Sequence, residues 1–175
     1  MRVYWPTTLA ELARVVGAGD LAPAPAVVHA VTRTLRDFYA DADPRDLEEE
    51  LEYVAMSDAA EQSVRLLGQD PSAAPRRVVL ALDVADDAVE VQPDAGWAAP
   101  ERSRVTVTVP LSLDALASVH VDDAEAEADV RAAVAVLAAA DAGDEDARFT
   151  VEACEGHDLL WYDASELPVL LAVGP

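Results

Sequence analysis

The feature that most constrains the fold is a continuous apolar run, VVLAL, at residues 78–82. A strand with one face in water alternates apolar and polar side chains, whereas this run has no polar face. Such a strand is typical of the middle of a sheet, where both of its faces are covered. The sequence therefore predicts a β-sheet in which residues 77–84 form a central strand.

Other segments have the composition or the alternation of strands. Val105, Val107 and Val109 alternate with threonines, which is typical of an antiparallel strand with one weakly packed face. Phe149 and Val151 also alternate with polar residues, which favours a strand there. Together with the central run, we expect strands at residues 2–5, 26–31, 105–109, 118–121, 149–154 and 159–162.

Helical periodicity separates these strands. Thr8 and Glu11 have capping-box spacing before an apolar stripe, and Pro44 suits the first position of a later helix. We expect helices at residues 8–17, 32–41, 43–67 and 164–171, with an Ala-rich helix closing near Asp141. Ser57-Asp58 leaves open whether residues 43–67 form one helix or two.

Helices interleaved with strands predict one domain over residues 1–175 with an α+β or α/β fold. We expect a single mixed β-sheet of about five to six strands packed with four to five helices. Residues 92–102 contain Pro93, Gly96 and Pro100, which predicts a flexible surface loop.

The charge balance narrows the classes of partner. Twelve arginines, no lysine and 34 acidic residues give a net charge of -22 and a pI of about 4.1. Nucleic acids and anionic membranes reward clustered cations, so neither is an expected partner. A basic protein partner or self-association is compatible with this surface. The sequence has no signal-peptide run and no apolar stretch long enough to span a bilayer, so we expect a cytoplasmic protein.

The candidate polar cluster centres on His120, Asp122 and Asp123 at the end of a predicted strand. His120 and Asp122 lie on one face of that strand, which makes a partial metal site. The remaining candidates for this cluster are His29, His157 and Asp158. The alternative reading is structural: Asp122 and Glu125 have capping-box spacing for the following helix, and His120 is then a packed core histidine.

Nucleophilic chemistry has little support in the sequence. Cys154 is the single cysteine, and the neighbouring Glu152 and Glu155 oppose its ionisation. No phosphate-binding glycine loop or serine elbow occurs, and we expect no cofactor and no bound transition metal. Aromatic residues are scarce, and a candidate aromatic pocket comprises Tyr4, Trp5, Trp161 and Tyr162.

Several short segments, taken in order, resemble a family of small, acidic actinobacterial proteins of unknown function. The segments are Met1 to Pro6, His29 to Thr32, Glu49 to Tyr53, Arg76 to Val79, Val119 to Asp123 and Leu160 to Tyr162. The resemblance covers nearly the whole chain and implies an actinobacterial, cytoplasmic origin. It implies no activity, ligand or catalytic residue.

Two functional hypotheses follow. The first is a noncatalytic binding or regulatory module, because polar chemistry is sparse and no catalytic constellation closes. The second is a small metal-dependent hydrolase that uses His120, Asp122 and Asp123, with His29 and His157 as further ligands. The positions of the three histidines in the fold separate the two.

Overall fold

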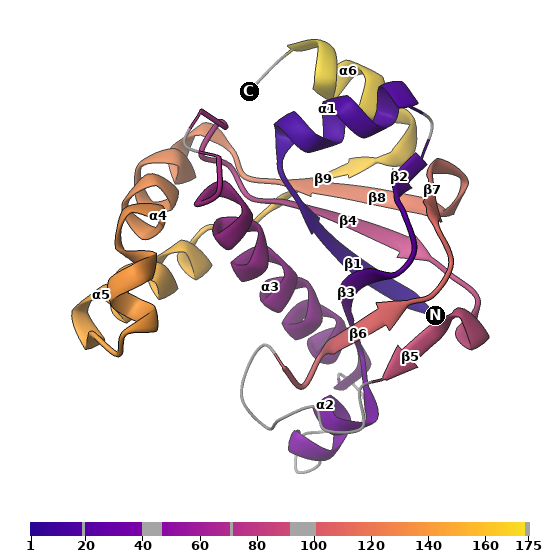
Figure 1. Ribbon diagram of the computed structural model, residues 1–175, viewed down its shortest axis with the longest axis horizontal. Helices are drawn as coiled ribbons and strands as arrows, with labels where there is room; N and C mark the ends of the chain where they lie inside the picture. Colours follow the sequence, from indigo (N-terminus) through magenta and orange to yellow (C-terminus); the bar gives the residue numbers. More distant parts are fainter. Residues whose placement is uncertain (19, 40–46, 71, 92–100, 174–175) are drawn as a thin grey trace.

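The computed structural model describes residues 1–18, 20–39, 47–70, 72–91 and 101–173 (Figure 1). Six α-helices occur in this part of the chain: α1 (Leu9–Ala18), α2 (Arg33–Phe38), α3 (Leu47–Leu67), α4 (Glu127–Asp141), α5 (Glu145–Glu152) and α6 (Leu167–Val173). The strands are β1 (Arg2–Thr7), β2 (Asp20–Ala22), β3 (Ala26–Ala30), β4 (Val78–Asp83), β5 (Val89–Val91), β6 (Arg104–Val107), β7 (Leu111–Ser112), β8 (Leu116–Val121) and β9 (Leu160–Asp163).

Seven strands form the main sheet in the order β5-β6-β3-β1-β4-β8-β9, and β2 pairs with β7 in a small second sheet. Every described pairing is antiparallel. The expected α+β fold is confirmed, although the main sheet is antiparallel and not mixed, and a second small sheet accompanies it. The main sheet has more strands than expected, because the short strand β5 gives no clear pattern in the sequence.

The central position predicted for residues 77–84 is also confirmed, since β4 lies between β1 and β8. Val78, Leu80 and Leu82 point into a core shared with α1 and α6. Val79 and Ala81 pack on the other face, against α2 and α3. Burial of both faces is the physical reason for the continuous apolar run.

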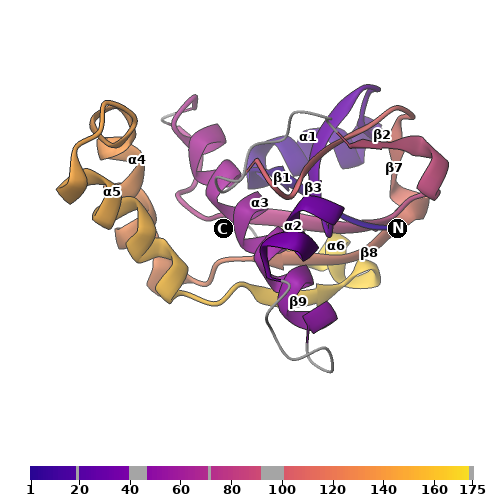
Figure 2. The same ribbon diagram turned by 90° about the horizontal axis from the view of Figure 1, so that it is seen from below.

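Helix α3 crosses one face of the sheet as a single helix through Ser57 and Asp58 (Figure 1). Its far side carries a second layer, in which Val64 and Leu67 pack with residues of α4 and α5. Figures 1 and 2 show α4 and α5 as an arm that stands beside α3, away from the sheet. No helix in the described residues is long and apolar enough to cross a membrane.

The strand predicted for residues 149–154 is wrong, because residues 145–152 form α5 and a 3-10 turn follows at Ala153–Gly156. Asp144 caps the helix by accepting a 3.0 Å hydrogen bond from the Ala147 amide. The buried residues are Ala147, Val151 and Cys154, which have the i, i+4, i+7 spacing of a helix face. Phe149, which suggested the alternation, is 74% exposed.

The loop expected at residues 92–102 lies outside the described residues except for Glu101 and Arg102. The same holds for residues 43–46 at the expected start of the third helix. The described part of that helix is Leu47–Leu67, and its end at Leu67 is the predicted one.

Candidate functional site

A cavity of about 860 Å³ lies where β1 and β3 separate. Their register contains only Val3 with Ala30 and Tyr4 with His29, although β1 continues to Thr7. From Trp5 onward β1 pairs with β4 alone. The cavity is therefore flanked by strands on two sides and by α1 and α3.

Local sequence explains why the strands part. Pro6 has no N–H and cannot donate to a second neighbouring strand, which shortens the ladder on the β3 side. The carbonyl of Thr7 instead accepts a 2.7 Å hydrogen bond from the Ser63 hydroxyl of α3. That contact anchors the end of β1 to the helix and leaves the space beside Trp5 open.

Two polar atoms of cavity-lining residues are buried without a hydrogen-bond partner among the described residues. They are Oγ1 of Thr7, a residue that is 1% exposed, and Nε of Arg104. Buried polar groups are nearly always hydrogen-bonded, because leaving one unpaired costs about 1–3 kcal/mol. Both atoms can donate, but both are enclosed in the wall of the cavity, so a ligand reaches them only when the wall shifts.

His29 reaches the same cavity from β3 and ends a buried relay of side chains. Ser103 donates to Asp58 Oδ2 at 2.5 Å, and His29 Nδ1 lies 2.8 Å from the Ser103 oxygen. Because the serine proton is directed at Asp58, Nδ1 of His29 is the donor to Ser103. That assignment leaves Nε2 of His29 as an acceptor with no partner among the described residues.

The relay places two titratable groups in an apolar interior. Burial raises the pKa of Asp58 to about 6, although the hydrogen bond from Ser103 opposes the rise. Burial lowers the pKa of His29 to about 4, and the positive charge of Arg104 adds to the effect. His29 is therefore neutral at pH 7, which suits a hydrogen-bond acceptor.

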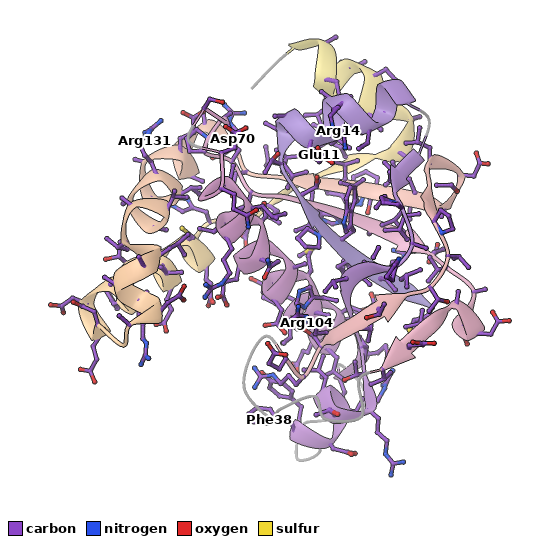
Figure 3. All side chains as sticks on the ribbon, viewed as in Figure 1. Glu11, Arg14, Phe38, Asp70, Arg104 and Arg131 are labelled. Atoms are coloured by element: carbon purple, nitrogen blue, oxygen red, sulfur yellow. The ribbon has the colours of Figure 1, made fainter. Side chains whose placement is uncertain are left out.

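The cavity is close to neutral in a chain of net charge -22. Three arginines line it, and so do three carboxylates: Arg14, Arg65, Arg104, Glu11, Asp70 and Glu101. Arg14 contacts Glu11 at 2.5 Å and Arg65 contacts Asp141 at 2.8 Å, whereas Arg104 reaches Glu101 only at 3.4 Å. Figure 3 shows Glu11 and Arg14 at the upper side of this region and Arg104 at its lower side. Arg104 is thus the arginine with the weakest ion pair of the three.

Asp122, the centre of the predicted polar cluster, is held by Arg77 in a buried ion pair. Its two oxygens accept from Arg77 Nη2 at 2.7 Å and from Nε at 2.9 Å, and Oδ2 also accepts from the Arg77 amide at 2.7 Å. Arg77 Nη2 also donates to the carbonyl of His157 at 2.7 Å. The pair joins the start of β4 to the end of β8 and to the chain after α5.

The neighbours of Asp122 have separate roles. Asp123, not Asp122, is the cap, and it caps the 3-10 turn Ala124–Ala126 that precedes α4 by accepting from the Glu125 amide at 2.7 Å. Nε2 of His120 lies 3.0 Å from the Ser118 hydroxyl on the same strand, and burial lowers the pKa of His120.

His157 contacts the Asp129 carboxylate at 2.7 Å, and with Asp158 it lines a second cavity of about 400 Å³. This cavity lies between α3 and the α4–α5 arm. Cys154 also lines it, and burial raises the pKa of that thiol to about 11. At pH 7 the thiol is neutral and a weak nucleophile.

The three histidines do not converge. β1 and β4 lie between β3 and β8, so His29 and His120 are three strand positions apart, or about 14 Å at about 4.8 Å per position. His29 and His157 line different cavities. Among the described residues, no group of three or more His, Cys, Asp or Glu side chains could hold a metal ion.

The four candidate aromatic residues also lie on separated strands. Tyr4 and Trp5 belong to β1, and Trp161 and Tyr162 belong to β9, with β4 and β8 between them. Tyr4 is buried against α3, Trp5 lines the cavity between β1 and β3, and Trp161 is 60% exposed.

Sequence reasoning identified His29 and missed the residues around it. Asp58 carried a signal, because it follows Leu51 and Ala55 at i+7 and i+3 and so falls on the buried face of α3. A carboxylate on an apolar helix face needs a partner. Ser103 and Arg104 gave no such signal in the sequence, because they are 74 and 75 residues from His29 in the chain.

Comparison with known protein families identifies the family of this chain. A family model described as a family of unknown function, DUF6912, matches residues 1–171. The searches of curated proteins and of solved structures found no match. The match extends from β1 to α6 and includes every residue that lines the cavity between β1 and β3. The chain therefore belongs to DUF6912, a family of unknown function.

Proposed function

We propose that this protein is a noncatalytic binding module whose ligand is a small organic anion held in the cavity between β1 and β3. The observation that carries the proposal is Arg104, a cavity-lining cation whose side chain is 41% exposed and reaches its nearest carboxylate, Glu101, only at 3.4 Å. A carboxylate or phosphate supplies acceptor oxygens for the exposed part of the Arg104 guanidinium. Trp5, Val27 and Leu66 supply apolar contact for the body of the ligand.

Neutral His29 adds specificity to the site. A ligand that carries a hydroxyl or N–H close to its anionic group can donate to Nε2, while Arg104 donates to the anion. No nucleophile accompanies these groups among the described residues lining the cavity, apart from the threonine hydroxyls of Thr7 and Thr8. Neither threonine is bonded to His29, so the arrangement supports binding rather than covalent catalysis.

The metal-dependent hydrolase built on His120, Asp122 and Asp123 gains no support from the described residues. Asp122 accepts three hydrogen bonds from Arg77, and Asp123 caps the turn before α4. A metal ion would have to break a buried ion pair to use Asp122, which costs about 3–5 kcal/mol. We also place the module in the cytoplasm of an actinobacterium, which the chain's resemblance and arginine-only basic content support.

The test is calorimetric titration with four probes: acetate, benzoate, inorganic phosphate and phenyl phosphate. The aromatic anions should bind more tightly than the bare ones, because Trp5 and Leu66 contact the ring. Replacing Arg104 by Gln should weaken binding about tenfold, since a charge-assisted hydrogen bond contributes more than 1 kcal/mol. Thr7→Val should weaken it less.

The matched control is Arg33→Gln on α2, whose side chain is 92% exposed and does not line the cavity. It removes the same charge and should leave affinity unchanged at 0.15 M salt. Equal weakening by Arg33→Gln and Arg104→Gln would mean that the anions respond only to net charge. Absence of binding by all four probes at millimolar concentration would refute the proposal.

A further inference from the structure

Strand β9 forms one edge of the seven-stranded sheet and pairs only with β8. Its four residues pair in continuous register, from Leu160 with Val121 to Asp163 with Ser118. On its other side, no described strand takes up the outward-facing N–H and C=O groups. An edge of this kind is a template for a further strand.

Natural edge strands usually carry features that prevent such pairing, and of these β9 has only its short length of four residues and the single charge of Asp163. Lysine, proline and a β-bulge are absent from Leu160–Asp163, where the register is regular. Two of its side chains offer exposed apolar surface, because Leu160 is 44% exposed and Trp161 is 60% exposed. Trp161 is the most exposed tryptophan of the described residues and lies across the strand from His120.

The residues around β9 are mostly acidic, which favours a basic partner. No arginine or lysine occurs after Arg148, whereas five carboxylates do, at Glu152, Glu155, Asp158, Asp163 and Glu166. Four of these lie within five residues of the strand, and Asp158, Asp163, Glu155 and Glu166 are all exposed. Arg2, whose charge reaches His120, is itself paired with Asp83 at 2.8 Å. The edge therefore has a strongly negative surround.

A second copy of this chain is a poor occupant, because each copy carries a net charge of -22 and brings the same carboxylates to the contact. An extended basic segment satisfies all three features of the edge. Its backbone completes the ladder, its apolar side chains contact Leu160 and Trp161, and its cations face the carboxylates. We propose that β9 docks an extended, basic peptide segment of a partner protein by strand addition. This proposal is independent of the anion site.

The probe is a fluorescently labelled ten-residue peptide of alternating arginine and valine. Its comparator is the peptoid with the same side chains, which keeps the charge and has no backbone N–H donors. Strand addition predicts that the peptide binds at least tenfold more tightly than the peptoid at 0.15 M salt, where nonspecific attraction is screened. Amide hydrogen exchange should slow at residues 160–163 when the peptide is bound.

Trp161→Ala should weaken peptide binding at least fivefold. Phe149→Ala is the matched control, because Phe149 on α5 is equally apolar and 74% exposed but lies away from the edge. Arg104→Gln should leave peptide binding unchanged, which separates this proposal from the anion site. Equal affinities for peptide and peptoid, equal effects of the two aromatic substitutions, or dimerisation of the chain through β9 would each overturn the proposal.

Discussion

The buried pair of Asp58 and His29 makes a sharp prediction about pH. Burial raises the pKa of Asp58 to about 6 from its ordinary value of 3.8, and burial and Arg104 lower the pKa of His29 to about 4 from 6.5. Between pH 4 and 6 the folded protein therefore holds a proton on Asp58 and none on His29. The unfolded chain holds the proton on His29 instead. The two states bind equal numbers of protons at this pair, so the pair adds no pH slope to stability there.

Replacing Asp58 or His29 removes that residue's contribution to the pH dependence of the unfolding free energy and leaves the contribution of the other residue. The stability linked to protonated Asp58 is fully present below pH 3.8 and is lost as the pH rises through about 6. The loss is about 3 kcal/mol, from a shift of roughly 2 units at 1.36 kcal/mol each. Asp58→Asn removes this loss. The unfolding free energy of the variant, measured relative to that of the wild type, should therefore increase by about 3 kcal/mol between pH 4 and 7.

His29→Asn should show the opposite trend. Neutral His29 contributes stability above pH 6.5, and this is lost as the pH falls through about 4. The variant does not have that loss. Its unfolding free energy, relative to that of the wild type, should therefore increase by about 3 kcal/mol as the pH falls from 7 to 4. The amide of asparagine can still donate to Ser103, which limits the packing cost of the substitution.

Urea denaturation followed by circular dichroism at four pH values measures both trends. Differences between variant and wild type cancel the titration of the exposed carboxylates, which is common to all the proteins. Asp37→Asn, an exposed carboxylate on α2, is the control and should give a flat difference. If the Asp58→Asn and His29→Asn differences both stay flat, or slope in the same direction, the proton assignment is wrong.

Three further results are expected. Asp122→Asn should lower the unfolding free energy by about 3–5 kcal/mol, because Arg77 is 4% exposed and is left as a buried charge, which urea denaturation would detect. Gly143→Ala should cost about 1–2 kcal/mol, because Gly143 has a φ of 97° that residues with a Cβ rarely adopt, and a smaller loss would show that the turn can rearrange. The melting temperature should rise between about 0.01 and 0.5 M sodium chloride, because salt screens the repulsion within a chain of charge -22; a flat scanning-calorimetry series would contradict this.

Patterns confined to one element predicted the fold well. The apolar run of β4 identified an interior strand of the sheet, and the helix expected at residues 43–67 identified α3. The error at α5 has the same origin, because Phe149 and Val151 fit a strand while Ala147 and Val151 fit a helix face. Alanine carries little hydrophobic signal, so the exposed phenylalanine outweighed it in the pattern.

The candidate site was less accessible from sequence, because its contacts join distant segments. His29 was identified by residue type, yet its relay depends on Ser103 from before β6 and Asp58 from the middle of α3. The spacing of Asp122 and Glu125 predicted Asp122 as the cap, whereas the cap is Asp123, the next residue. Only the structure shows that the Asp122 carboxylate is bonded to Arg77. Buried polar pairs over such separations leave no local periodicity.

The position of β1 between β3 and β4 has a consequence for synthesis on the ribosome. Residues 2–7 pair with residues 78–83, so about 70 residues must be made after β1 before its main neighbour exists. At ordinary elongation rates this takes roughly 4 to 14 s. Until then β3 can hold β1 at only two positions, Val3 and Tyr4. An apolar segment destined for the interior of the sheet thus emerges first and stays largely unpaired while about 70 further residues are made, which makes residues 2–7 a part of the nascent chain that a chaperone can bind.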